Sequence, residues 1–347
     1  MRLSTSSSDW RRFFVLASGT AAGAAALLYA FVVIIDPFGT LPLSPPLPRA
    51  PVSTNARFAF PALARSASFD SAVAGTSTSR LLRPAALDPA FGGARFVNLS
   101  MNAATAYEQA RILGVFLRAH PAPRAVVLGL DIAWCSTGPL QHYTERPFPE
   151  WMYGRDRWRG YREMFNLYAL TEAWAQFLHV TRLKRSRYGL DGYTSFVPDD
   201  SLYDPARVAT HLAEDEAQFS RADVAGDPAS WHFAALNLLE QILADVPATT
   251  PVMLYFVPYN HVLQQPGTDM SAVWAACKAQ TVAAAQNRPN VAIADFMIPS
   301  PITADDNNYW DALHYRVAIA DRMAGDLAAA SRKQASAAGD YRLLTAP

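Results

Sequence analysis

AVVLGL at residues 125–130 and VMLYFV at residues 252–257 are the two stretches of sequence that decide the fold. Neither stretch shows the alternation of apolar and polar residues that a strand with one face in water would have. Continuous apolar runs of this length are typical of strands that are buried on both faces of a parallel sheet. We therefore expect an α/β fold.

Further strand and helix patterns alternate around these two stretches. Short strands are expected at residues 71–74, 95–99 and 291–296. Such alternation, with right-handed crossovers, predicts a three-layer α/β/α arrangement in which helices cover both faces of a parallel sheet. The expected helices span residues 105–120, 231–246, 272–286 and 316–329.

Residues 136–226 interrupt this rhythm and are expected to form a mostly helical insertion. The segment is rich in Trp, Tyr and Arg, and residues 167–187 have a helical pattern with a basic end. The insertion follows the carboxyl end of the AVVLGL strand, which is where open α/β sheets bind ligands. Two interpretations remain open: a lid or substrate platform, and a helical pair that supports the core or lies near a membrane.

An uncharged apolar stretch at residues 13–35 predicts a transmembrane helix. Its length of about 23 residues suffices to span the ~30 Å hydrocarbon layer. Arg2, Arg11 and Arg12 precede it, so residues 1–12 are expected to form a cytoplasmic tail and the rest to lie outside the cytoplasm. A retained anchor is favoured over a cleaved signal peptide, because the stretch exceeds the usual 7–15-residue apolar core and lacks a small-x-small cleavage site.

The remaining chain divides into two parts. Residues 36–66 are rich in Pro and Ser and are expected to form an extended tether, since Pro favours polyproline geometry. Residues 67–335 are expected to form the folded domain.

Composition limits the classes of function. Thirty basic residues balance thirty acidic ones, and no nucleic-acid-binding motif is present, so nucleic acid is not an expected partner. Cys135 and Cys277 are too few and too far apart for a metal site or a disulfide framework. Two partly buried free thiols are favoured, although an oxidising compartment would allow one bridge. No cofactor is expected.

The first chemical motif is Gly75-Thr76-Ser77, which lies between an expected short strand and a helical pattern. Gly75 permits a tight turn, so the Ser77 hydroxyl would lie at the carboxyl end of the strand. Nearby backbone N–H groups could then bind an oxyanion. Ser77 is the candidate nucleophile, and Ser79 is a weaker one. The alternative is that Thr76, Ser77 or Thr78 only caps the helix.

The second motif is Asp311-x-x-His314, just before the last expected helix. With this spacing, Asp311 can orient the imidazole of His314, which can accept the proton of a serine nucleophile. A histidine that merely caps or packs at the helix start is the alternative. An early Ser and a late Asp-x-x-His on an α/β chain favour a Ser77–His314–Asp311 triad.

With these motifs the chain resembles the SGNH/GDSL-type hydrolases, in the membrane-anchored group that includes the D-alanyl transfer protein and the alginate O-acetyltransferases. The resemblance covers residues 68–327 except the insertion. It implies that Ser77 is the nucleophile and that Asp311 and His314 complete the triad. The glycine of the family's second block, whose backbone N–H helps to bind the oxyanion, corresponds to Asn102 or Ala103.

Two positions depart from the family pattern. Thr76 stands where the usual Gly-Asp-Ser block has Asp, and Asp131 follows AVVLGL where an Asn donor to the oxyanion would be expected. An ionised Asp131 cannot donate a hydrogen bond, and the loss of one such donor costs ~10²–10³ in rate. Asn260 and His261 follow the VMLYFV strand and are expected either to contact substrate or to be ordinary loop residues.

The resemblance implies an esterase or O-acyltransferase at the inner membrane, with its catalytic domain in the periplasm or otherwise outside the cytoplasm. Its substrate would be a cell-envelope glycan or another acyl ester, and a membrane-bound acyl donor would be its partner. The alternatives are a non-catalytic SGNH-like protein that binds glycan or acts as a scaffold, and a structural subunit of a membrane complex.

Overall fold

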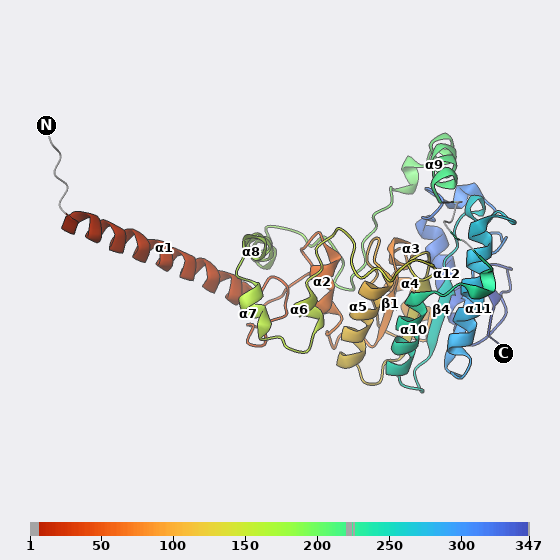
Figure 1. Cartoon of the computed structure of the whole chain (residues 1–347), viewed down its shortest axis with the longest axis horizontal. Helices are drawn as coiled ribbons and strands as arrows, with labels where there is room; N and C mark the ends of the chain where they lie inside the picture. The colour runs from red at the N-terminus through yellow and green to blue at the C-terminus, as the bar shows by residue number, and fades with distance from the viewer. Residues whose placement is uncertain (1–6, 220–223, 225, 346–347) are drawn as a thin grey trace.

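A six-stranded sheet forms the centre of the protein in the computed structural model, which describes residues 7–219, 224 and 226–345 (Figure 1). The strand order is β2–β1–β3–β4–β5–β6. All neighbouring strands are parallel except β6, which pairs antiparallel with β5. The strands are β1 (Ser71–Ala74), β2 (Phe96–Asn98), β3 (Ala125–Leu130), β4 (Val252–Phe256), β5 (Val291–Asp295) and β6 (Arg342–Leu343).

The α/β class is confirmed, whereas the sheet is mixed and not purely parallel. The AVVLGL and VMLYFV stretches form β3 and β4, whose residues are all buried and which pair in register with Leu128 opposite Leu254. β6 was not predicted, because two residues near the chain end carry no local strand pattern. Its position at the sheet edge depends on pairing with β5.

The predicted helices at residues 105–120, 231–246, 272–286 and 316–329 correspond to α5, α10, α11 and α12, with ends displaced by a few residues. α5 begins at a capping box in which Thr105 and Glu108 each accept a backbone N–H of the other. α10 packs against α5 and α11, and α12 packs against α4 and over β4 and β5. The helices of this part are α2 (Ala56–Leu63), α3 (Ser77–Arg80), α4 (Pro84–Ala90), α5 (Ala106–Ala119), α10 (Ala234–Asp245), α11 (Asp269–Ala285) and α12 (Val317–Ser331), with short 3₁₀ helices η2 (Pro228–Ser230), η3 (His261–Leu263) and η4 (Asp306–Asn308).

Helix α1 (Ser7–Ile35) projects away from the sheet (Figure 1). Its segment Asp9–Ile35 is long and apolar enough to cross a membrane, with a mean hydropathy of 1.9 over an 18-residue stretch. A membrane anchor and a signal sequence both fit this finding. Residues 1–6, which belong to the predicted cytoplasmic tail and include Arg2, lie outside the described residues.

The structure differs from the expected extended tether at residues 36–66. This segment contains α2, and Leu41 and Phe60 are fully buried. The carboxylate of Asp36 accepts the backbone N–H groups of Thr40 and Leu41, which folds the chain back just after α1. Pro and Ser content does not reveal such packing, because burial depends on where the apolar side chains between the prolines meet the domain.

The insertion at residues 136–226 is helical only in parts, and residues 220–223 and 225 lie outside the described residues. α8 ends at Val180, so the basic residues up to Arg187 lie beyond the helix. Irregular segments join the helical ones, and the insertion contacts two separate parts of the protein, since α8 contacts α1 while α9 contacts η3 and η4. Its helices are α6 (Glu150–Tyr153), α7 (Arg159–Glu163), α8 (Leu167–Val180), η1 (Asp200–Leu202) and α9 (Pro205–Phe219).

The expectation of two free thiols is wrong, because Cys135 and Cys277 form a disulfide. Cys135 follows β3 and Cys277 lies on α11, with Cα atoms 5.5 Å apart and both side chains fully buried. The two residues are 142 positions apart in the chain. Only the tertiary structure, which brings α11 beside the segment after β3, makes them neighbours, so their spacing in the sequence gave no sign of the bridge.

Candidate active site

Ser77 lies at the first position of α3, two residues after Gly75 at the end of β1. A side chain on Gly75 would place its Cβ 2.2 Å from the Oγ of Ser79, so this turn requires glycine. Thr76 occupies the cap position of α3, but its side chain makes no capping hydrogen bond there. The Thr76 hydroxyl therefore does not cap α3.

Ser79, the weaker candidate nucleophile, is fully buried. Its Oγ accepts a hydrogen bond of 2.8 Å from the hydroxyl of Tyr255. A Cβ on Gly129 would lie 2.0 Å from the same oxygen, so Ser79 fills the space left by two glycines. Ser79 is therefore a core residue, and Ser77 is the serine of this motif that lines a cavity.

The structure brings Ser77 together with His314, although 237 positions separate them in the sequence. The Nε2 of His314 lies 2.7 Å from the Oγ of Ser77, and its Nδ1 lies 2.8 Å from the Oδ2 of Asp311. A proton on Nδ1, donated to the carboxylate, leaves Nε2 free to accept the proton of the serine hydroxyl. The three side chains are thus arranged as a nucleophile, a base and an orienting carboxylate.

The carboxylate of Asp311 is held in its charged form. Burial by itself would raise its pKa, but the hydrogen bond and charge of His314, together with hydrogen bonds from the backbone, outweigh that effect and lower the pKa of Asp311. The backbone N–H groups of Leu313 and His314 add hydrogen bonds of 2.8 Å to Oδ1. An ionised Asp311 can therefore stabilise the imidazolium that forms when His314 accepts a proton.

Helix α9 of the insertion supports the loop that contains Asp311 and His314. Asp215 accepts the backbone N–H of Ala312 at 2.9 Å, and the Nδ1 of His211 lies 3.2 Å from the carbonyl oxygen of Trp310. Burial and the charge of Asp311 raise the pKa of Asp215. The role of Asp215 could not be predicted from the sequence, because an aspartate on an otherwise ordinary helix carries no signal of its tertiary partner.

A cavity of about 430 Å³ opens beside Ser77. Residues after β3 that belong to the insertion line much of it, which agrees with the expectation of a ligand site at the carboxyl end of this strand. A second cavity, of about 370 Å³, lies on the side of His314 that faces α9. The residues that line the first cavity, beside Ser77, include Thr76, Ser77, Ala103, Asp131, Ser136, Leu140, Gln141, Tyr259 and Leu313.

Ala103 lines the cavity with Ser77, and its φ of 50° lies in the left-handed region that favours glycine. This is the conformation expected at a position where the SGNH/GDSL-type hydrolases, which the chain resembles, have glycine. In the part of the chain that the structure describes, the backbone N–H groups of Ser77 and Ala103 donate no hydrogen bond. These two donors are the candidates for binding an oxyanion.

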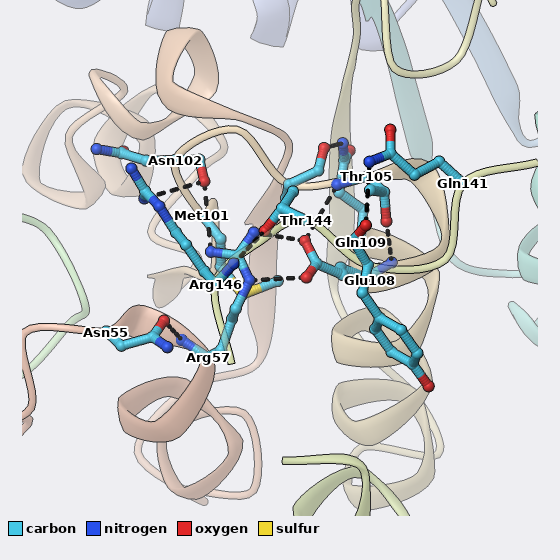
Figure 2. A network of polar contacts seen from close by, with 12 residues as sticks. Asn55, Arg57, Met101, Asn102, Thr105, Glu108, Gln109, Gln141, Thr144 and Arg146 are labelled. Carbon is cyan, nitrogen blue, oxygen red and sulfur yellow. Dashed lines mark hydrogen bonds and ion pairs between the residues drawn. The ribbon is translucent and has the colours of Figure 1, made fainter. Parts of the chain in front are cut away.

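Asn102 does not line the cavity, and its oxygens accept hydrogen bonds that hold this loop in place. Its side-chain Oδ1 accepts a hydrogen bond of 2.8 Å from Arg80. Its backbone oxygen accepts from Arg57 and Arg146, each at 3.4 Å (Figure 2). Arg57 is itself fixed by a buried ion pair with Glu108 of α5 (Figure 2).

Asp131 lines the cavity at the end of β3 and is almost fully buried. Burial raises its pKa to about 6, against the opposing effect of hydrogen bonds from the Thr76 hydroxyl and the Ala133 N–H. The two departures from the family pattern, Thr76 and Asp131, are therefore hydrogen-bonded to each other. The expectation that Asp131 is ionised holds only well above pH 6.

Asn260 and His261 do not line the Ser77 cavity. Asn260 is fully buried, its backbone N–H donates to the carbonyl oxygen of Ala312, and its side-chain amide donates to Asp306. His261 lies 3.1 Å from the same carboxylate and is partly exposed. Of the two roles considered, these contacts fit loop residues, which support the segment before Asp311.

No model of a protein family matches the chain, and no curated protein matches it. The arrangement around Ser77 is therefore interpreted from its own geometry.

Proposed function

We propose that the protein is a membrane-anchored serine esterase or O-acyltransferase of the SGNH type, with its active site outside the cytoplasm. The observation that carries the proposal is the 2.7 Å contact between the Oγ of Ser77 and the Nε2 of His314, with Asp311 on Nδ1. A mostly parallel sheet with Ser77 at the carboxyl end of β1 is the arrangement expected of a three-layer SGNH-like domain.

The proposed reaction has two steps. The Oγ of Ser77 attacks the carbonyl carbon of an ester while His314 takes its proton, and the carbonyl oxygen becomes an oxyanion. Collapse of this intermediate breaks the bond to the leaving alcohol, to which His314 returns the proton, and an acyl-serine remains. Water, or a hydroxyl of an acceptor, then attacks the acyl-serine while His314 takes its proton. The bond between the acyl group and Oγ breaks, the acid or the new ester leaves, and His314 returns the proton to Ser77.

The backbone N–H groups of Ser77 and Ala103 are the proposed oxyanion donors. Both residues line the cavity, and donors fixed before the reaction stabilise developing charge without reorganising. A third donor, supplied by Asn in the resembling family, is replaced by Asp131. Its raised pKa allows the protonated carboxyl to donate a hydrogen bond at low pH.

The location outside the cytoplasm is supported by two features. Arg11 and Arg12 stand before the apolar part of α1, and basic residues at one end of a membrane-spanning helix favour the cytoplasmic side for that end. The Cys135–Cys277 disulfide lies in the folded domain, and such bonds persist mainly in oxidising compartments. A cell-envelope glycan as acyl acceptor, and a membrane-bound acyl donor as partner, follow from the family resemblance.

A fluorophosphonate probe tests the nucleophile directly, because it reacts with activated serines. Full-length protein in detergent should be labelled on Ser77, and Ser77→Ala should lose both the label and hydrolysis of a chromogenic short-chain ester. Ser79→Ala is the matched control, and it should keep the label because Ser79 is a core residue. If wild type and Ser77→Ala show the same negligible turnover and labelling, the proposed enzymatic function is excluded.

One observation favours the second candidate, a non-catalytic SGNH-like protein that binds envelope glycan or acts as a scaffold. Asp131 stands where the third oxyanion donor would be, and the Thr76 hydroxyl donates to it and so is turned away from an oxyanion. Glycan binding that is equal in wild type and Ser77→Ala, without turnover, would support this candidate.

A further inference from the structure

Large apolar side chains are exposed on the insertion next to the end of α1. Trp158, Phe165, Leu167 and Trp174 are 61%, 69%, 80% and 56% exposed. They belong to the segment that contains α7 and α8, which Figure 1 places beside the end of α1 and away from the sheet. Concentrated exposed apolar surface of this kind marks an interaction site.

One face of α8 is apolar along its whole length. Leu167, Leu170, Trp174 and Phe177 follow one another at intervals of three or four residues, which places them on one side of the helix. The buried residues of α8 form a different stripe, which packs against the body of the protein. In the apolar stripe of α8 (Leu167, Leu170, Trp174, Phe177), Leu167 and Trp174 are exposed, whereas Leu170 and Phe177 are half-buried and also pack against the core.

This stripe meets α1 through aromatic contacts. The ring of Phe31 lies 6.4 Å from that of Trp174 and 5.9 Å from that of Phe177. Tyr29 lies 5.5 Å from the ring of Phe165, and its hydroxyl donates to the backbone oxygen of Tyr161 at 2.6 Å. The depth of α1 in a bilayer therefore sets the depth of these side chains.

Helix geometry gives that depth. Arg12 is the last charged residue before the apolar part of α1, and at ~1.5 Å per residue a ~30 Å hydrocarbon layer ends about 20 residues later, near residue 32. Tyr29 and Phe31 then lie at the outer boundary of the hydrocarbon. Phe165 and Trp174, which touch them, lie at the same level.

The basic residues on both sides of α8 and a cavity beside α1 also agree with a position at the outer boundary of the hydrocarbon layer. Exposed basic residues stand on both sides of α8, at Arg162 before it and at Arg182, Lys184 and Arg185 after it. Aromatic rings together with basic side chains are typical of the membrane interface. An almost wholly apolar cavity of about 300 Å³ lies between α1 and α8, and lipid acyl chains fit its chemistry.

We propose that the apolar stripe of α8, with Phe165 and Trp158, lies in the outer interface of the phospholipid bilayer that α1 enters. In Figure 1 α8 is seen nearly end-on whereas α1 lies across the view, so the two helices cross, as expected if α8 lies along the membrane surface. The domain then has two membrane attachments, which fix its orientation. The inference rests on the membrane insertion of α1 proposed above.

Spin labels on the full-length protein in phospholipid nanodiscs test the inference. Both native cysteines are in the disulfide, so single cysteines can be labelled at chosen positions. Leu167→Cys and Trp174→Cys should be several-fold more accessible to oxygen, relative to a water-soluble nickel complex, than the control Leu202→Cys. Leu202 is also exposed in the insertion, at 70%, but lies near α9 and outside the α8 region.

A label at Leu16→Cys reports the insertion of α1 separately. If this label is in the bilayer while labels at Leu167 and Trp174 match the Leu202 control, only the interfacial position of α8 is overturned. If the Leu16 label is in water, the anchor is overturned as well. Protection of the α8 labels from both oxygen and nickel would mean that a second copy covers the stripe, which also overturns the proposal. Phe165→Cys repeats the test should one variant fail to fold.

Discussion

Replacement of Asp131 by Asn should stabilise the protein at pH 8 and do little at pH 4. Burial raises the pKa of Asp131 to about 6 from an ordinary value of 3.8. The folded protein therefore binds more protons than the unfolded chain between these values. The stability that this group contributes is present below pH 3.8 and is lost as the pH rises through about 6.

The raised pKa sets the magnitude of the effect. The rise of the pKa from 3.8 to about 6 corresponds to ~3 kcal/mol, since a tenfold change in an equilibrium constant is ~1.4 kcal/mol. Asn has nearly the same shape and can accept the N–H of Ala133, but it does not ionise. The free energy of unfolding of Asp131→Asn, relative to wild type, should thus rise by about 2–3 kcal/mol between pH 4 and pH 8.

Urea unfolding of the full-length protein in detergent micelles, followed by tryptophan fluorescence at a series of pH values, measures this difference. Asp245→Asn is the matched control, since Asp245 is an exposed carboxylate at the end of α10 and should show no such trend. A difference between Asp131→Asn and wild type that stays constant from pH 4 to pH 8 would refute the reasoning.

Three further changes have defined outcomes. Asp311→Asn should slow fluorophosphonate labelling by roughly 10³–10⁴-fold, because His314 loses its charged partner; an unchanged rate would remove Asp311 from the mechanism. Asp215→Leu should lower kcat for a chromogenic ester more than it changes KM, and Asp215→Asn, which keeps an acceptor for the Ala312 N–H, should retain most activity; equal losses would contradict the positioning role. Cys135→Ser with Cys277→Ser should lower the free energy of unfolding by roughly 2–5 kcal/mol in urea, and no change would argue against the bridge.

Local pattern alone predicted the central strands and the main helices around them. β3 and β4 are continuous apolar runs, and such runs have few alternatives to burial inside a sheet. α5 and α12 were predicted as well, because the helical pattern of each lies within one continuous segment of the sequence. β6 and α2 were missed, because their conformation depends on pairing or packing with distant parts of the chain.

The sequence by itself also determined the candidate residues Ser77, Asp311 and His314, because chemistry limits which residue types can act as nucleophile, base and orienting carboxylate. Only the tertiary structure decided that Ser77 Oγ and His314 Nε2 lie 2.7 Å apart. It also decided that Asn260 supports a loop and does not reach the Ser77 cavity.

The protonation of Asp131 and the contact of Asp215 with the Asp311 loop likewise depended on tertiary structure. The physical reason is the same in each case. A residue's type and its near neighbours in the chain set its intrinsic chemistry and its local conformation. Its burial, its pKa and its partners depend on segments far away in the sequence, such as α9 against the loop before α12, and these meet only when the chain folds.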